Sequence, residues 1–264
     1  MTVELDFSHV RRRARSLDVG RAVLEDHERA LVIESWRGRM VMEYSSARVF
    51  GDLVGQAMRA GISPRVVADI ARMASEEIEH GELCAEVLVN LDADPVASAP
   101  ELLPPAAPHD DASPKVAFLR NVLSIGCASE TVAVALVEGE RAIALTPDLE
   151  RVLTRILKDE IGHARLGWSS LRRAAADLGR AELDEVERYL PSLFEHQIRH
   201  YGPLAALPRT TERARRAGAP DGRAQHAIFW ETLETVIVPG LEGAGLAATR
   251  ALERALERAL PRAS

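Results

Sequence analysis

The sequence contains two copies of a short pattern that places a carboxylate and an imidazole three residues apart. Glu77 and His80 form the first pair, and Glu160 and His163 form the second. In both copies an acid precedes the Glu, an Ile follows it, and a small residue follows the His. In a helix this offset puts both side chains on one face, where they can ligate a divalent cation together. One such pair is expected by chance among eight histidines, but the repeated context indicates a metal site.

Proline and glycine predict where the helices that carry these pairs begin and end. Three sites combine an N-cap oxygen with a proline at the first helical position, namely Ser63-Pro64, Ser113-Pro114 and Thr146-Pro147. Gly61 and Gly179 are expected to end the helices before them. The predicted helices are a long one that ends near Ala60, one that begins near Pro64, one from about Pro114 to Leu145, and one from about Pro147 to Leu178.

The segment 92–112 separates these two helical hairpins. It is rich in alanine and proline, which excludes a regular helix or a central strand, so we expect a long crossover. Ala, Leu, Glu and Arg dominate the rest of the chain and aromatic residues make up only 4%, which favours an all-α protein. Two antiparallel hairpins with a long connection predict a four-helix bundle of ferritin-like connectivity.

The chain is expected to fall into three parts. These are an N-terminal segment (1–20), the four-helix bundle (21–180), and a C-terminal helical extension packed on the bundle (181–264). Within the extension we expect a polar loop over 209–222. The predicted helices there run from about 181 to 201 with an interruption or kink at Pro191, from about 222 to 237, and from just after Pro239-Gly240 to about Leu260.

Counting from the turns predicts which residues lie at the same depth in the bundle. Glu77 and Glu160 each lie 14 residues beyond the Ser or Thr that caps their helix. At about 1.5 Å per residue, both are about 21 Å from their turns. The partner helices should offer ligands at this depth, near residues 46 and 131, and Glu43 and Glu130 are the acids found there, each within an apolar stripe.

Four carboxylates that project into one apolar core need compensating positive charge. A buried carboxylate that stays ionised without a partner costs several kcal/mol. Two divalent cations supply four positive charges, which balance four carboxylates. This charge balance predicts a dinuclear metal site.

The arrangement resembles the ferritin-like diiron carboxylate superfamily, which has a Glu on the first and third helices and Glu-x-x-His on the second and fourth. The resemblance covers about residues 21–178. It implies two iron ions as the cofactor, with manganese as the alternative metal. It also implies which residues bind them: Glu43, Glu77 and His80 for one ion, and Glu130, Glu160 and His163 for the other. Which carboxylates bridge the ions is left open.

The acid before each Glu-x-x-His pair has a role in several members of this superfamily. There it accepts a hydrogen bond from the metal-bound histidine of the opposite helix. By this resemblance Glu76 would orient His163, and Asp159 would orient His80. The alternative interpretation is that both acids are exposed to solvent.

The resemblance implies a non-haem diiron oxidoreductase or oxygenase, which activates O2 to oxidise a small organic substrate. Hydroxylation, desaturation and N-oxygenation all stay open. The alternatives are a ferroxidase or iron-storage protein, a peroxide-scavenging protein like rubrerythrins or manganese catalases, and a non-catalytic helical scaffold. The expected partners are a small-molecule substrate, O2 and an external electron donor. A homodimer is left open.

Charge and cysteine content bound the remaining function classes. The chain has 33 Lys and Arg against 40 Asp and Glu, a formal charge of −7, which disfavours a nucleic-acid partner. Cys84 and Cys127 cannot form a disulfide framework, so a reducing cytoplasm fits. We expect no membrane span, because no uninterrupted apolar run reaches about 18 residues. The predicted location is cytoplasmic.

Overall fold

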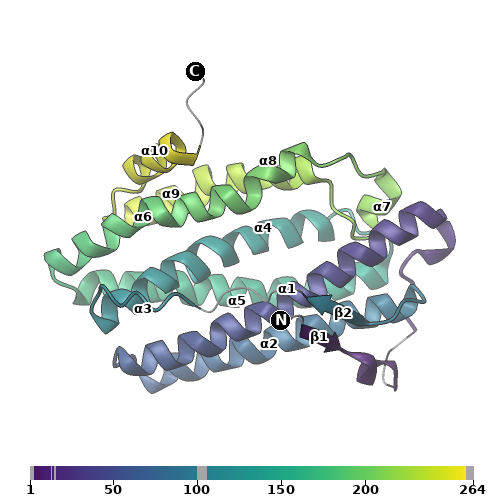
Figure 1. The fold of residues 1–264 in the computed structure, drawn as a ribbon, viewed down its shortest axis with the longest axis horizontal. Coiled ribbons are helices and arrows are strands. Elements are labelled where there is room, and N and C mark those ends of the chain that lie inside the picture. Colours follow the sequence, from purple (N-terminus) through teal and green to yellow (C-terminus); the bar gives the residue numbers. More distant parts are fainter. Residues whose placement is uncertain (1–2, 13, 15, 100–105, 260–264) are drawn as a thin grey trace. The chain divides into compact units, whose positions relative to one another are not determined.

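The computed structural model describes residues 3–12, 14, 16–99 and 106–259, which are built almost entirely of helices (Figure 1). The predicted all-α class is therefore confirmed. Two compact units make up the chain. The first unit comprises Met1–Ala107, Val137–Asp159 and Arg209–Asp221, and the second comprises Pro108–Leu136, Glu160–Pro208 and Gly222–Ser264. The domain boundaries expected near residues 20 and 180 stay predictions.

A long helical hairpin dominates the first unit. Helix α1 (Asp26–Arg59) and helix α2 (Pro64–Asn90) lie side by side in Figure 1, with the boundaries that the sequence predicts. Gly61 makes the turn with a φ of +68°, a left-handed conformation that favours glycine. Ser63 takes the N-cap position of α2 without a side-chain hydrogen bond. Large apolar residues of α1, such as Trp36, are fully buried.

A two-stranded antiparallel sheet and a short helix complete the first unit beyond what the sequence predicts. Strand β1 (Val3–Asp6) pairs with strand β2 (Val96–Ala99), which lies inside the expected crossover. Within that crossover, residues 100–105 lie outside the described part of the chain. Helix α7 (Glu212–Arg216) corrects the expected polar loop over 209–222. It forms because the Thr211 hydroxyl caps it, and Trp36 Nε1 donates to the carbonyl of Ala217 at 2.9 Å.

The helix expected from Pro114 to Leu145 contains a wide π-helical turn. It consists of α3 (Pro114–Val122), the π-helix η3 (Leu123–Ser129) and α4 (Glu130–Arg141). Helix α5 (Pro147–Asp177) follows close to its predicted bounds. Both α4 and α5 are continuous helices that begin in one unit and end in the other.

The C-terminal helices of the second unit differ in detail from the sequence expectations. Helix α6 (Arg180–Tyr201) continues through Pro191, so the interruption expected there is wrong. Gly179 has a φ of −70° and is the N-cap of α6, so α5 ends at Asp177 without a left-handed glycine. Pro239 lies within a helical run, because proline is tolerated in the first turn of a new helix. This run consists of α8 (Gly222–Thr232), the π-helix η5 (Leu233–Ile237) and α9 (Val238–Gly243), and α10 (Ala248–Ala259) follows it. The expected end near Leu260 lies outside the described residues.

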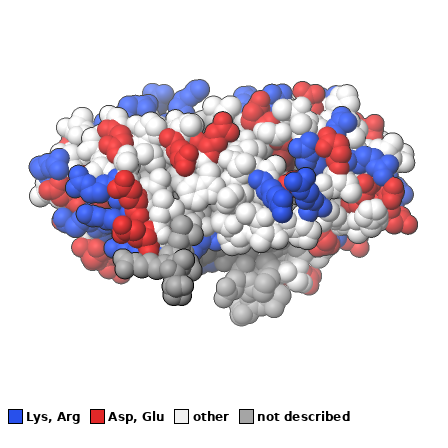
Figure 2. Space-filling model, turned by 90° about the horizontal axis from the view of Figure 1, so that it is seen from above, with Lys and Arg blue, Asp and Glu red and all other residues white. Residues whose placement is uncertain are grey.

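One helical stretch among the described residues is long and apolar enough to cross a membrane by length and composition alone. It is Pro114–Arg141, and 44% of its most apolar window is buried inside the protein. The core helix of a soluble protein passes the same test, and this stretch carries the buried acid Glu130. On the face that Figure 2 shows, acidic and basic side chains are interspersed. The cytoplasmic location stays a prediction.

Candidate metal centre

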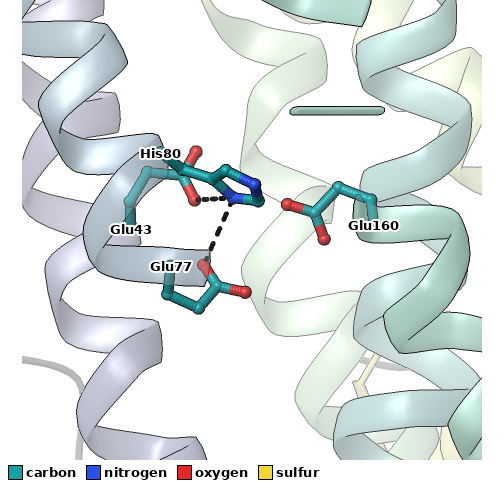
Figure 3. Close-up of side chains that lie close together, drawn as sticks. All are labelled: Glu43, Glu77, His80 and Glu160. Atoms are coloured by element: carbon teal, nitrogen blue, oxygen red, sulfur yellow. Dashed lines mark ion pairs between the residues drawn. The ribbon is translucent and has the colours of Figure 1, made fainter. Parts of the chain in front are cut away.

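Glu43, Glu77 and His80 form a cluster in the first unit, which we call the first triad; Glu77 and His80 are buried and Glu43 is half-buried. His80 Nδ1 lies 3.6 Å from a carboxylate oxygen of Glu43 and 3.9 Å from one of Glu77. Figure 3 shows the three side chains turned toward one another, with Glu43 from α1 and Glu77 and His80 from α2. His80 is fully buried and Glu77 is 2% exposed. The hairpin thus places the three predicted ligands of one metal ion together.

The other nitrogen of the His80 ring has a fixed partner. Nε2 of His80 lies 3.1 Å from Oδ2 of Asp159, which is the pairing that the resemblance predicts. An ionised carboxylate can only accept, so Nε2 carries the ring proton and donates it to Asp159. The lone pair on Nδ1 then faces Glu43 and Glu77. This is the tautomer that a metal ligand requires.

Glu130, Glu160 and His163 form the equivalent cluster in the second unit, the second triad. His163 Nδ1 lies 3.7 Å from Glu130 and 3.4 Å from Glu160, measured to the nearest carboxylate oxygen. All three residues are buried, with exposures of 7%, 4% and 1% for Glu130, Glu160 and His163. Glu130 is the first residue of α4, and the other two lie on α5. The second unit therefore repeats the ligand types and spacing of the first.

Two contacts hold the helices of the second triad close together. A Cβ atom on Gly126 would lie 2.7 Å from the Cα atom of Gly167, so these two backbones touch. Trp168 Nε1 also donates to the Thr131 hydroxyl at 3.0 Å. Gly126 is about one helical turn before Glu130 and Gly167 is about one turn after His163. The contacts thus flank the triad and explain why its ligands converge.

The separations within each triad fit a shared cation better than direct hydrogen bonds. Distances of 3.4–3.9 Å between Nδ1 and carboxylate oxygens exceed the usual range of about 2.7–3.2 Å for such bonds. Two donor atoms that bind one ion at about 2.1 Å each lie roughly 3–4 Å apart. Within each triad the ligand atoms lie within 4.8 Å of one another. These buried Glu and His clusters could therefore hold metal ions.

Burial makes the carboxylates of the triads costly without a cation. Desolvation and then the neighbouring Glu160 carboxylate raise the pKa of Glu130. In the first unit, Arg39 stands one turn before Glu43 on α1. Burial alone would lower the pKa of Arg39, but Glu140, Cys84 and Glu43 raise it above its ordinary value. Arg39 is itself paired with Glu140, so it offsets little of the charge of the triad.

The two cysteines beside the triads are free, buried thiols. Burial raises the pKa of Cys84, and the nearby Glu43 carboxylate raises it further. Burial also raises the pKa of Cys127. Both groups are therefore neutral near pH 7, and a neutral thiol is a poor metal ligand. The carboxylates and imidazoles are the ligands that these clusters offer.

Glu76 and Asp159, the acids that precede the two Glu-x-x-His pairs and that we call the outer acids, differ in what surrounds them. Asp159 contacts His80, as described above. Glu76 accepts from Arg72 at 2.6 Å, whereas its expected contact with His163 would join the two units and stays a prediction. Arg155, a residue not expected at the site, contacts both Asp159 and Glu79. The signal for it was present, because an Arg stands four residues before the outer acid in both copies of the pattern.

A comparison of the chain with protein-family models, with curated proteins and with solved structures finds no match. Any assignment of function therefore depends on the chemistry of the two triads. The strongest observation for that purpose is that each unit holds two glutamates and one histidine at matching separations, and that all of them except the half-buried Glu43 are buried.

Proposed function

We propose that the two triads form one dinuclear iron centre inside a ferritin-like four-helix bundle, and that the protein is an O2-dependent oxidoreductase that oxidises a small organic substrate. The observation that carries this proposal is the duplicated Glu, Glu, His triad. Each copy offers two oxygen ligands and one nitrogen ligand, a set that suits iron and also manganese. The paired pattern is the one expected for carboxylate-bridged dinuclear sites in helix bundles.

The continuity of α5 supports one centre rather than two separate ones. Asp159 belongs to the first unit, where it holds His80, and Glu160 is the next residue of the same helix. Consecutive Cα atoms are about 3.8 Å apart. A ligand of the second triad thus follows directly on the residue that anchors the first triad. Consecutive residues of one helix therefore join the two clusters, which favours a shared centre.

Charge supports the same conclusion. Four glutamates carry four negative charges when ionised, and the two imidazoles are neutral when they act as ligands. Two divalent cations cancel this charge, whereas one would leave a net charge of about −2 in a buried site. Two divalent ions are therefore the smallest number that balances the charge of four ionised glutamates.

Each residue of the proposed centre has a defined task. Glu43, Glu77 and His80 would hold one ion. Glu130, Glu160 and His163 would hold the other. When bound, the iron pair would supply the electrons and the open coordination position that O2 activation requires. Asp159 keeps the proton of His80 on Nε2, so that Nδ1 stays a ligand. The buried surroundings exclude bulk water from the site.

The second histidine favours oxidation of an organic substrate over iron storage. Ferroxidase centres of the storage type often lack one of the two imidazoles, whereas both are present and buried in this chain. Two electrons per turnover must then come from outside, because Cys84 and Cys127 are isolated free thiols and form no redox pair. We therefore propose a separate electron donor as a partner.

The test is an anaerobic titration of the metal-free protein with Fe(II), followed by exposure to O2. The proposal expects two irons per chain and a visible absorption change on oxidation. Glu130→Ala and His163→Ala should each lower the stoichiometry, whereas His196→Ala, an exposed histidine on α6, should leave it at two. No iron binding, or unchanged loading in both ligand variants, would overturn the proposal. Accumulation of an iron core in a large assembly would instead favour storage.

A further inference from the structure

The pattern that carries the ligands extends four residues further toward the N-terminus than the outer acid. Arg72 stands four residues before Glu76, and Arg155 stands four residues before Asp159. Both arginines form ion pairs with these acids. We propose that Arg155 is a positioning residue, which fixes Asp159 so that this acid in turn orients the metal-binding imidazole of His80. This inference rests on the proposed metal centre.

The contacts of Arg155 go beyond an ordinary pair along one helix. Its guanidinium contacts Oδ2 of Asp159, the same oxygen that lies 3.1 Å from His80 Nε2. A second nitrogen of the guanidinium lies 2.9 Å from Glu79, the residue directly before His80 on α2. Arg155 therefore bridges α5 to α2 beside the histidine. A surface pair between neighbouring turns makes no such bridge.

The contact between Arg155 and Asp159 is more shielded from solvent than the one between Arg155 and Glu79. The Asp159 side chain is only 9% exposed, whereas that of Glu79 is 53% exposed. The guanidinium fixes the oxygens of this largely shielded carboxylate, and Oδ2 in turn holds the Nε2 side of the His80 ring. Nδ1 of His80 then stays directed toward Glu43 and Glu77.

Arg72 forms a similar ion pair with the outer acid of α2. It lies 2.6 Å from Glu76, whose side chain is 13% exposed, and 3.5 Å from Asp69. These two acids belong to its own helix, and Gly162 occupies the position that corresponds to Glu79. Among the described residues, Arg72 thus has no counterpart of the bridge that Arg155 makes to Glu79. We therefore confine the inference to Arg155.

The surroundings of Arg155 also supply a matched control and a rescue experiment. Arg155 and Arg151 line the same pocket of about 390 Å³, and the Arg155 side chain is 41% exposed. Arg151 pairs with Asp148, one turn earlier on α5, and neither residue belongs to a triad. Arg155→Ala should leave a solvent-accessible gap at this pocket, which free guanidinium can enter. Arg151→Gln removes a similar charge without touching Asp159.

The first test reads the tautomer of His80 in the metal-free protein. Two-dimensional 1H–15N spectra of 15N-histidine-labelled protein near pH 8 should show a proton on Nε2 in the wild type. Arg155→Gln should give a mixture of both tautomers, Arg155→Lys an intermediate result, and Arg151→Gln the wild-type spectrum. Millimolar guanidinium should restore the Nε2 tautomer in Arg155→Ala. A wild-type spectrum in Arg155→Gln would overturn the inference.

The second test asks whether Arg155 acts through Asp159. Substitution of groups that orient a metal ligand typically costs about 10- to 100-fold in metal affinity. We expect Arg155→Gln to weaken Co(II) binding by about 10-fold in the wild-type background and to have no effect in the Asp159→Asn background. Equal losses in both backgrounds would overturn the inference and indicate a merely structural role.

The two proposals fail in different ways. If the wild type binds two metal ions but Arg155→Gln changes neither the His80 tautomer nor the affinity, only the positioning role is wrong. If the tautomer changes as expected but no iron is bound, the iron centre is wrong, while the Arg155, Asp159 and His80 chain stands as a property of the fold.

Discussion

Gly126 and Gly167 bring the backbones of η3 and α5 into direct contact, because a Cβ atom on Gly167 would lie 2.7 Å from the carbonyl oxygen of Gly126. This contact flanks the second triad. Close packing of the two helices therefore explains why residue 167, one turn after His163, is a glycine. By contrast, a Cβ atom on Gly162 would meet no other atom within 4 Å.

We expect Gly126→Ala and Gly167→Ala to destabilise the protein, because either methyl group would push η3 and α5 apart. Overpacking of this kind typically costs about 1–3 kcal/mol in the free energy of unfolding. Gly51→Ala is the matched control, since a Cβ atom there meets nothing within 4 Å. It should raise stability by about 0.5–1 kcal/mol through helix propensity. Urea denaturation measures all three, and equal effects would contradict the predicted contact.

The pair of Arg39 and Glu140 should be strongly coupled. Their side chains are 16% and 10% exposed, and the Arg39 guanidinium also lies 5.0 Å from the centre of the Trp36 ring. Arg39→Met should cost about 3–5 kcal/mol, because it leaves the Glu140 carboxylate buried without its partner. The double variant Arg39→Met/Glu140→Leu should recover most of this loss. Additive losses in a double-mutant cycle would show that the two side chains are independent.

The stability of the metal-free protein should fall as the pH rises. The pKa of Glu130 is raised in the folded state, so the folded protein keeps a proton that the unfolded chain releases above its own pKa of about 4.5. Stability is therefore lost between that value and the raised pKa of the folded state. Metal binding, which requires the ionised form, should stabilise the protein more at higher pH.

Glu130→Gln should flatten this dependence, as measured by urea denaturation between pH 5 and pH 9 in the presence of a chelator. Glu138→Gln is the control, because Glu138 is paired with Arg141 near the surface and its pKa is lowered. An unchanged slope in Glu130→Gln would show that this carboxyl does not titrate as described.

The two thiols should be unreactive in the folded protein. Cys84 and Cys127 have no measurable exposure, and burial raises the pKa of both. Alkylation at pH 8 should therefore be at least about 100-fold slower in buffer than in denaturant, because the reagent reaches a buried thiol only after local unfolding of the surrounding helices. Rapid labelling of either thiol in the native state would show that its helix opens readily.

Local signals in the sequence were sufficient for the hairpin and for both triads. Gly61 and Pro64 define the turn between α1 and α2, because each acts through its own backbone geometry. The ligand pairs are three residues apart on single helices, so a helical prediction already places them together. Glu43 and Glu130 required only a count of residues along helices of known rise.

Other features depend on contacts that no local pattern encodes. The π-helix η3 needs hydrogen bonds five residues apart, and no residue type marks it in the sequence. The strand Val96–Ala99 forms because a partner from the N-terminus pairs with it. The bridge from Arg155 to Glu79 joins residues 76 positions apart. Pairings of this kind follow from the packing of helices rather than from propensity.

The central claim is that the two triads share one dinuclear centre, and the distance between the bound metal ions tests it most directly. X-ray absorption spectroscopy of the protein loaded with two Fe(II) per chain measures this distance. The proposal predicts an iron–iron scattering contribution at about 3.5–4 Å, the separation that is typical of two-metal sites. Two bound irons without such a contribution would contradict it, because they would occupy two separate mononuclear sites.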